Sequence, residues 1–258
     1  MEFGYWGIKG RGELIRWLIA YLKLDVKEVA YTDPAVWFGD KKKSLNLPFP
    51  NLPYLVDGNV KLSESAAIPV YLSGKANRSD LFGKDFTEQA QVRMILGVLE
   101  DISKNAFMPI YASPNEEATK AGYAKALEEG SAAVTKINEI AAFLGDKEYL
   151  LGHLTFADLS LAYVSEVFAA TTLALGVPCP VCKHENISKL VERVHSLEGI
   201  KDLVEARKEI PYLPPHMIKF HCFTAAELAK KRAIECKCPG NSCQCTNCPL
   251  GQKCNCAK

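Results

Sequence analysis

In the first 76 residues, stretches with the hydrophobic spacing of strands and of helices follow one another in a definite order. This order limits the possible folds more than any other feature of the sequence. Residues 2–6 form a short strand-like stretch, and residues 12–24 then carry apolar side chains at helical spacing. A second strand is predicted at residues 27–31, and two apolar runs at 53–56 and 60–62 flank Asp57-Gly58-Asn59, a hairpin turn signal. A helix over about residues 65–76 follows. This βαβ–ββα order predicts a small α/β domain.

The rest of the chain is predicted to be almost entirely helical. Helices are expected at residues 88–111, 116–144, 156–175, 187–196 and 200–209, whereas residues 32–48 and the polar linker 77–86 are expected to be irregular. Capping boxes mark helix starts at Thr155–Asp158 and at Thr224–Glu227, the second before a short helix at 228–234. The fold class is therefore α/β plus all-α. We expect an α/β domain at 1–78, a helical bundle domain at 87–215, an extension at 216–235 and a tail at 236–258.

Composition excludes several classes of protein. Hydrophobic residues make up 48% and charged residues 24% of the 258 residues, which excludes a disordered or collagen-like chain. The 31 Lys and Arg residues nearly balance the 30 Asp and Glu residues, so no overall field attracts nucleic acid or anionic lipid. The longest uncharged run, residues 167–182, is shorter than a membrane span, and no signal peptide is visible. We expect a cytoplasmic protein that binds neither nucleic acid nor membranes.

The cysteines are confined to the last part of the chain. All ten lie at or after position 179, whereas a secreted disulfide scaffold would spread them through the fold. Between residues 236 and 256, Leu250 is the only apolar side chain besides cysteine and proline, so this segment cannot bury a core of its own. Seven of the cysteines lie in this tail, at Cys236, Cys238, Cys243, Cys245, Cys248, Cys254 and Cys256.

The tail has the composition of a site for soft metal ions. Its Cys-x-Cys pairs place two thiolates where they can share one ion or bridge two, an arrangement that resembles metallothionein. Thiolates select Cu(I), Zn²⁺ or Cd²⁺ over hard cations, and the spacing matches neither common ferredoxin run. The alternative is a tail of free or oxidised thiols.

Cys179-Pro180-Val181-Cys182, with His184 nearby, resembles a redox or zinc pair. It follows a helix rather than a strand, so we expect a loop with two ordinary cysteines, and a zinc site completed by His221 and Cys222 is the alternative. The histidines show no helical metal-pair spacing. They are expected at the surface: His153, His184, His195, His216 and His221.

Five motifs together resemble a known family. They are Tyr5-Trp6, Gly10-Arg11-Gly12-Glu13, the FPNLPYL run at 49–55, Glu64-Ser65-x-Ala67-Ile68, and the capping box at 155–158. In this order and spacing they resemble the cytosolic glutathione transferases over about residues 3–215. The run at 49–55 is Mu-like and the glycine-rich motif is closer to the Alpha and Sigma classes, so the class stays open. The resemblance implies a thioredoxin-like N-terminal domain, a helical domain, and a homodimer that conjugates glutathione to small apolar electrophiles.

The resemblance also assigns the catalytic group. Glutathione reacts as a thiolate, yet a free thiol with a pKa of about 8.5 is only slightly ionised at neutral pH. A neutral phenol that donates a hydrogen bond to the sulfur stabilises the anion, and the family's catalytic tyrosine corresponds to Tyr5. Arg11 would add positive charge near the sulfur. The alternative for Tyr5 is an aromatic side chain that fills the core.

The other glutathione contacts follow from the same resemblance. The family keeps a cis peptide at the position of Leu52-Pro53, which pairs with the cysteinyl part, while Ser65 suits the γ-glutamyl carboxylate and Glu64 the ammonium. As alternatives, Ser65 is only a helix cap and the lysines at 41–43 lie in a solvated loop. The resemblance implies further glutathione contacts, of which only one of the two lysines is used: Trp6, Trp37, Lys41 or Lys42, and Asn51.

The helical domain is expected to supply the electrophile pocket and the dimer face. Asp101 matches a Sigma-class residue that reaches the glutathione ammonium of the partner subunit, and its alternative is a solvated carboxylate. Ile8, Met108 and Tyr111 would line the substrate pocket, although Met and aromatic residues at helical spacing often fill cores. Two other classes of function compete with conjugation: a crystallin-like structural protein, and a metal-buffering or stress protein whose body mainly carries the tail.

Overall fold

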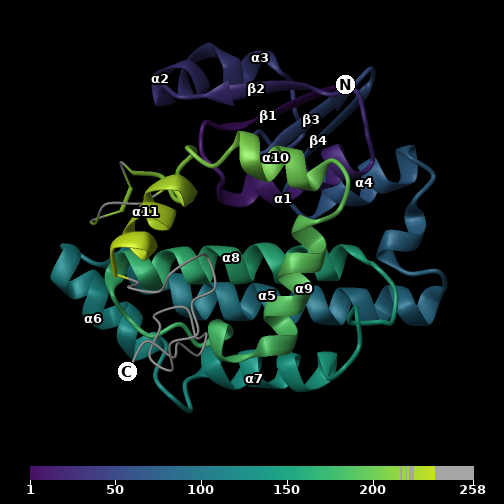
Figure 1. Cartoon of the computed structure of the whole chain (residues 1–258). Coiled ribbons are helices and arrows are strands. Elements are labelled where there is room, and N and C mark those ends of the chain that lie inside the picture. Colours follow the sequence, from purple (N-terminus) through teal and green to yellow (C-terminus); the bar gives the residue numbers. More distant parts are fainter. Residues whose placement is uncertain (216, 219, 221–223, 236–258) are drawn as a thin grey trace, which may run out of the picture.

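A mixed four-stranded sheet forms the N-terminal part of the computed structural model, which describes residues 1–215, 217–218, 220 and 224–235. The strands are β1 (Glu2–Trp6), β2 (Lys27–Tyr31), β3 (Tyr54–Asp57) and β4 (Val60–Ser63), in the order β2-β1-β3-β4. β1 runs parallel to β2 and antiparallel to β3, and β3–β4 is the predicted hairpin. Helices α1 (Gly10–Tyr21) and α4 (Ala67–Lys75) lie between this sheet and the helical half (Figure 1). The predicted thioredoxin-like order is confirmed.

Residues 32–48 are not irregular as the sequence predicts. They contain helix α2 (Pro34–Val36), a wide turn at Trp37–Lys41, and helix α3 (Lys42–Ser44). Asp33 begins this stretch because its carboxylate accepts a hydrogen bond from the amide of Ala35, and the proline that follows it suits the first helical turn. The lysines at 41–43, expected in a loop, therefore lie in short helical turns.

The second part of the chain is helical, as expected. It consists of α5 (Phe86–Ala112), α6 (Glu116–Ala126), α7 (Ala132–Leu144), α8 (Phe156–Leu175), α9 (Glu185–His195), α10 (Ile200–Ala206) and α11 (Ala225–Glu235). The prediction of one helix over 116–144 is wrong. The chain turns at Gly130, whose φ of 81° favours glycine, and the Ser131 hydroxyl then caps α7 by accepting from the amide of Val134.

Helix α8 packs against α5 and α9 and lies on the side of the helical part that faces the sheet (Figure 1). Among the described residues it alone has the length and apolar composition of a membrane span, and 78% of its apolar window is buried inside the protein. A core helix of this kind meets the same criterion.

The prediction of two ordinary cysteines after α8 is also wrong. Cys179 and Cys182 form a disulfide bond, with their Cα atoms 5.4 Å apart. His184 does not approach this pair as a metal ligand, because its Nε2 lies 3.0 Å from Oδ1 of Asn138. The described histidines are not simple surface residues, since His153, His184 and His195 are half-buried; His216, His221 and Cys222 lie outside the described residues.

The capping box that begins α8 is confirmed. The buried Asp158 carboxylate accepts hydrogen bonds from the amide of Thr155 at 2.8 Å, its hydroxyl at 2.7 Å, and the amide of Leu150 at 2.7 Å. Burial raises the pKa of this carboxyl, and the three hydrogen bonds oppose that rise. Both carboxylate oxygens are therefore needed as acceptors.

We predict that Asp158→Asn lowers the free energy of unfolding by about 1–3 kcal/mol, because an amide leaves at least one buried donor without an acceptor. Urea denaturation of the purified protein measures this. Asp85→Asn is the matched control, since Asp85 caps α5 at an exposed site where asparagine caps equally well. Equal losses in the two variants would contradict the prediction.

Candidate active site

Tyr5 lies at the end of β1 with its hydroxyl facing the start of α1. Its side chain is buried, and its Oη accepts a hydrogen bond from the amide of Arg11 at 3.0 Å. Among the described residues, the hydroxyl hydrogen of Tyr5 has no acceptor. The phenol therefore has its proton available for a group outside the chain.

Two glycines make this approach of helix and ring geometrically feasible. A Cβ atom at Gly10 would lie 2.8 Å from Oη of Tyr5, and one at Gly12 would lie 2.4 Å from Cδ1 of its ring. Gly10 also has a φ of +43°, which other residues rarely adopt. The glycines of the predicted motif therefore serve the ring of Tyr5 directly.

The electrostatics keep the Tyr5 phenol neutral. Burial raises the pKa of Tyr5 above its ordinary value, while the Arg11 amide and the charges of Arg11 and Arg16 oppose the rise. A phenol with a raised pKa retains its proton at neutral pH. It can therefore act as a hydrogen-bond donor there.

A second group of predicted residues meets at the start of β3 and α4. The Leu52-Pro53 peptide is cis, as the resemblance implies. The Asn51 side chain binds in two directions, since its oxygen accepts from the amide of Leu52 at 2.9 Å and its nitrogen donates to Oε1 of Glu64 at 3.2 Å. Glu64 has a φ of 76°, and its carbonyl accepts from the amides that open α4. Ser65 follows it and is half-buried.

The aromatic members of the predicted site form a third group. Trp37 is buried against Tyr31 and stacks on Tyr54 at a centroid distance of 6.0 Å. Trp6 packs edge-on against Tyr31 and also contacts Phe38, over which Nζ of Lys42 lies at 5.7 Å. Lys41 and Lys42 are both half-buried, so the structure leaves either able to serve as the contact.

The predicted residues of α5 lie at the surface. Asp101 is exposed, with Oδ2 3.5 Å from Nζ of Lys136 on α7. Met108 and Tyr111 are also exposed, so the alternative that they fill the core is wrong. Ile8 is buried, and its Cδ1 would lie 3.1 Å from a Cβ atom at Gly10, next to Tyr5.

Sequence reasoning missed a buried arginine beneath Tyr5. The Arg16 guanidinium lies 5.7 Å from the Tyr5 ring centroid and pairs with Glu28 at 2.7 Å and Glu13 at 3.1 Å. It also donates to the carbonyl of Trp6 at the end of β1 and to the carbonyls of Ile8 and Lys9 in the loop that follows. Helical periodicity places Glu13 and Arg16 on the face of Gly12, but charged residues on a helix ordinarily indicate a solvated face.

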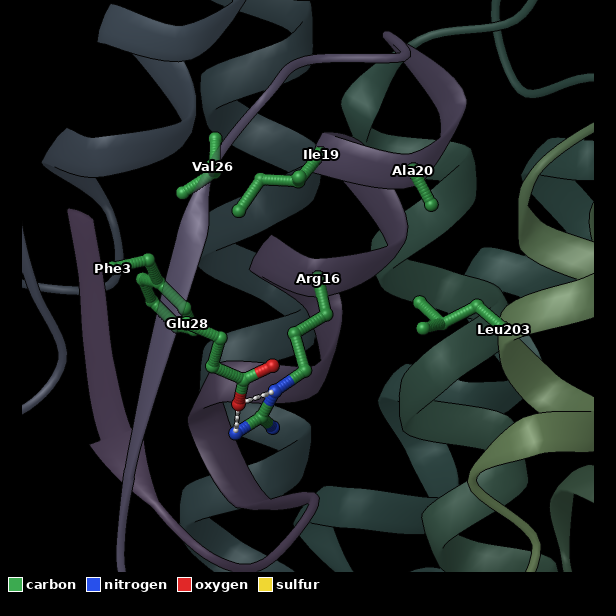
Figure 2. A pocket seen from close by; sticks show the side chains of 7 residues that line it. All are labelled: Phe3, Arg16, Ile19, Ala20, Val26, Glu28 and Leu203. Atoms are coloured by element: carbon green, nitrogen blue, oxygen red, sulfur yellow. Dashed lines mark hydrogen bonds and ion pairs between the residues drawn. The ribbon is translucent and has the colours of Figure 1, made fainter. Parts of the chain in front are cut away.

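A cavity of about 110 Å³ lies where the sheet, α1 and α10 meet, and Arg16 forms part of its wall (Figure 2). The two charged groups in its wall, Arg16 and Glu28, are already paired with each other. None of the residues predicted for the site lines it. Its lining consists of Phe3, Arg16, Ile19, Ala20, Val26, Glu28 and Leu203.

In the described part of the chain, no three His, Cys, Asp or Glu side chains come together as a metal site requires. The seven predicted metal ligands, Cys236 to Cys256, lie outside the described residues.

Known proteins are similar to this chain in sequence and in fold. Residues 1–74 match the family model described as the N-terminal domain of glutathione S-transferase. The sequence is 35% identical to Glutathione S-transferase 2 of Gallus gallus over 209 residues, which are 78% of this chain and 87% of that protein. It is 30% identical to Glutathione S-transferase Mu 4 of Homo sapiens over 223 residues, or 82% of this chain and 93% of that protein.

The fold is also that of a solved transferase. The crystal structure of the glutathione S-transferase Blo t 8 matches with a TM-score of 0.71 at 24% identity, covering 86% of this chain and 100% of that chain. The sequence relatives extend over both the sheet and the helices, well beyond the N-terminal match. The chain therefore belongs to the glutathione S-transferase family, Mu-like in its relatives, and is an enzyme of the transferase class.

Proposed function

We propose that this enzyme conjugates the thiolate of glutathione to small apolar electrophiles and that Tyr5 stabilises the thiolate. The observation that carries the proposal is the environment of the Tyr5 hydroxyl. The Arg11 amide orients its oxygen, and burial raises its pKa, so the hydroxyl retains its proton. Donation of that proton to the sulfur favours the anion, and each pKa unit by which the thiol is lowered corresponds to about 1.36 kcal/mol. Arg11, with its exposed side chain, adds positive charge at the same place.

Glutathione would extend from Tyr5 toward the cis-proline turn and the start of α4. The Leu52 backbone before Pro53 would pair with the cysteinyl part, and Ser65 and Glu64 would take the γ-glutamyl carboxylate and ammonium. The Asn51–Glu64 hydrogen bond supports this, because it joins two proposed contacts. The glycyl end would meet Trp37 and one of Lys41 and Lys42 near Trp6. Ile8, Met108 and Tyr111 would line the electrophile pocket. A crystallin-like role is not favoured, since these groups are intact.

We predict that Tyr5→Phe keeps the fold and lowers turnover by roughly 10- to 100-fold, because a charge-assisted hydrogen bond worth about 1.5–3 kcal/mol is lost. The ultraviolet thiolate band of bound glutathione should appear at higher pH. Conjugation of chlorodinitrobenzene and a thiolate titration measure both effects. A variant with the parental rate and pH profile would show that Tyr5 is not the catalytic residue.

We also propose a homodimer in which Asp101 reaches the glutathione ammonium of the partner subunit. Its exposure on α5 supports this, since the carboxylate is weakly paired within its own chain at 3.5 Å from Lys136. Such a dimer completes each site with a residue of the other copy.

Asp101→Ala should raise the apparent KM for glutathione more than that for the electrophile, because only the glutathione contact is removed. Steady-state kinetics with each substrate varied in turn measure this. Lys136→Ala is the matched control, since it breaks the same ion pair from α7 and should change neither KM. A monomer by sedimentation at assay concentrations would contradict the proposal.

The cysteine tail has a separate proposed function, the binding of Zn²⁺, Cu(I) or Cd²⁺. The composition of the tail supports this function. Residues 236–256 hold seven cysteines, and apart from cysteine and proline their only apolar side chain is Leu250. We further propose the division of the chain that the sequence predicts: an α/β domain at 1–78, a helical domain at 87–215, an extension at 216–235 and the tail at 236–258. Metal buffering would then accompany conjugation in a cytoplasmic enzyme.

Deletion of residues 236–258 should remove bound metal and leave conjugation nearly intact, because the tail follows the transferase body. Elemental analysis of full-length and truncated protein, both purified under reducing conditions, measures the metal. Equal metal contents would contradict the tail proposal without affecting the proposed conjugation.

A further inference from the structure

A buried ion pair joins the loop after β1 to helix α8. Lys9 is 1% exposed, and its Nζ lies 2.9 Å from Oε1 of Glu166. The same carboxylate accepts hydrogen bonds from Oη of Tyr212 at 2.6 Å and from Nε2 of His195 at 3.0 Å. Glu166 thus binds side chains from three other parts of the fold.

The carboxylate of this cluster is fully charged. Burial opposes ionisation of Glu166 most strongly, but the His195 hydrogen bond, the Lys9 charge and the Tyr212 hydrogen bond together lower its pKa to about 2. Nζ of Lys9 also lies 4.0 Å from the centroid of the Tyr212 ring. A buried ion pair is weak evidence for stability, because desolvation of the two charges offsets their attraction. The geometry of this pair therefore points to a role other than stabilisation.

The cluster surrounds a short piece of backbone. The amide of Lys9 donates to the carbonyl of Pro211 at 2.8 Å, and the amide of Gly10 donates to the carbonyl of Tyr212 at 3.0 Å. The Gly10 carbonyl accepts from Oη of Tyr163 at 2.7 Å, and Tyr163 lies three residues before Glu166 on α8. The next amide in the chain, that of Arg11, is the one that orients Tyr5.

We propose that Glu166 is a positioning residue of the transferase reaction: by holding Lys9 and Tyr212 it fixes the Gly10–Arg11 backbone, so that the Arg11 amide meets the Tyr5 hydroxyl. This proposal rests on the proposed role of Tyr5. Its consequence is that a residue of the helical domain, without touching glutathione, sets the geometry of thiolate formation in the α/β domain.

The sign of one measurement separates positioning from a direct charge effect. Other titratable or charged groups interact with this region. Tyr163 interacts electrostatically with Glu166, Glu13 and Tyr5, and Tyr5 with Arg11 and Arg16; burial raises the pKa of both tyrosines. Loss of the Glu166 charge would by itself favour a nearby anion and move thiolate formation to lower pH. Loss of the Arg11–Tyr5 geometry moves it to higher pH.

The test is Glu166→Gln in the full chain, followed by the ultraviolet titration of bound glutathione and by the pH profile of conjugation. The half-ionisation point should rise by about 0.5 to 1 pH unit, as expected when a hydrogen bond of ordinary strength is weakened. At about pH 6.5, kcat/KM should fall about three- to tenfold, whereas KM for glutathione should hardly change.

Matched variants keep loss of stability apart from loss of position. Asp158→Asn also destabilises α8, but it contacts neither Lys9 nor Tyr212 and should leave the titration unchanged. Lys9→Met should reproduce the shift of Glu166→Gln. The double variant should shift no further, because both changes break one link, and it should be at least as stable as either single variant, because no unpaired charge is left buried. If Glu166→Gln does not fold, the double variant therefore carries the same test.

Three results would overturn the proposal: an unchanged titration in Glu166→Gln, a downward shift, or an equal upward shift in Asp158→Asn. If any of these occurs while Tyr5→Phe still raises the half-ionisation point, the positioning role is wrong and the role of Tyr5 stands. If Tyr5→Phe itself changes nothing, the proposed function fails together with this inference.

Discussion

The Arg16 guanidinium is the interaction on which the arrangement of the site depends. It is buried, it binds Glu28 of β2 and Glu13 of its own helix, and it donates to the carbonyls of the loop between β1 and α1. Glu13 passes the connection on, since both its oxygens accept from Nε of Arg207 just after α10. One side chain therefore sets the sheet, the loop and α1 relative to one another.

The loop after β1 is held from two directions. Arg16 binds its carbonyls from beneath, while the backbone of Pro211 and Tyr212 binds two of its amides. The amide of Gly7 also donates to the Tyr31 carbonyl of β2, so the backbone of this loop is bound both to the sheet and to the segment after α10. The loop leads directly into Gly10 and Gly12, the two glycines that the ring of Tyr5 approaches closely.

Local patterns predicted the fold well where one local interaction decides the outcome. β1 and β2 begin and end at the predicted residues, and the capping boxes of α8 and α11 are in place. The prediction of a single helix at 116–144 failed because helical periodicity continues across the turn at Gly130. The prediction of an irregular stretch at 32–48 failed because its short helical turns have no clear hydrophobic pattern. The spacing of Cys179 and Cys182 is compatible with a dithiol, a metal pair or a disulfide, and only the fold of the loop decides.

Short sequence motifs pointed to the residues proposed for the site, but not to the charged residues packed around them. Tyr5, Asn51 and Glu64 lie where short motifs placed them, whereas Lys9, Arg16 and Glu166 give no signal, because a lone charge in a sequence indicates solvent.

The pairing of Lys9 with Pro211 also bears on how the enzyme is made. Their backbones bond across 202 residues of chain, and ribosomes add about 5–20 residues per second, so roughly 10–40 seconds separate the synthesis of the two partners. During that interval the nascent α/β domain holds Tyr5 and its glycines but not the segment that fixes its loop. The α/β domain therefore leaves the ribosome before the segment that binds its loop at Lys9 and Gly10.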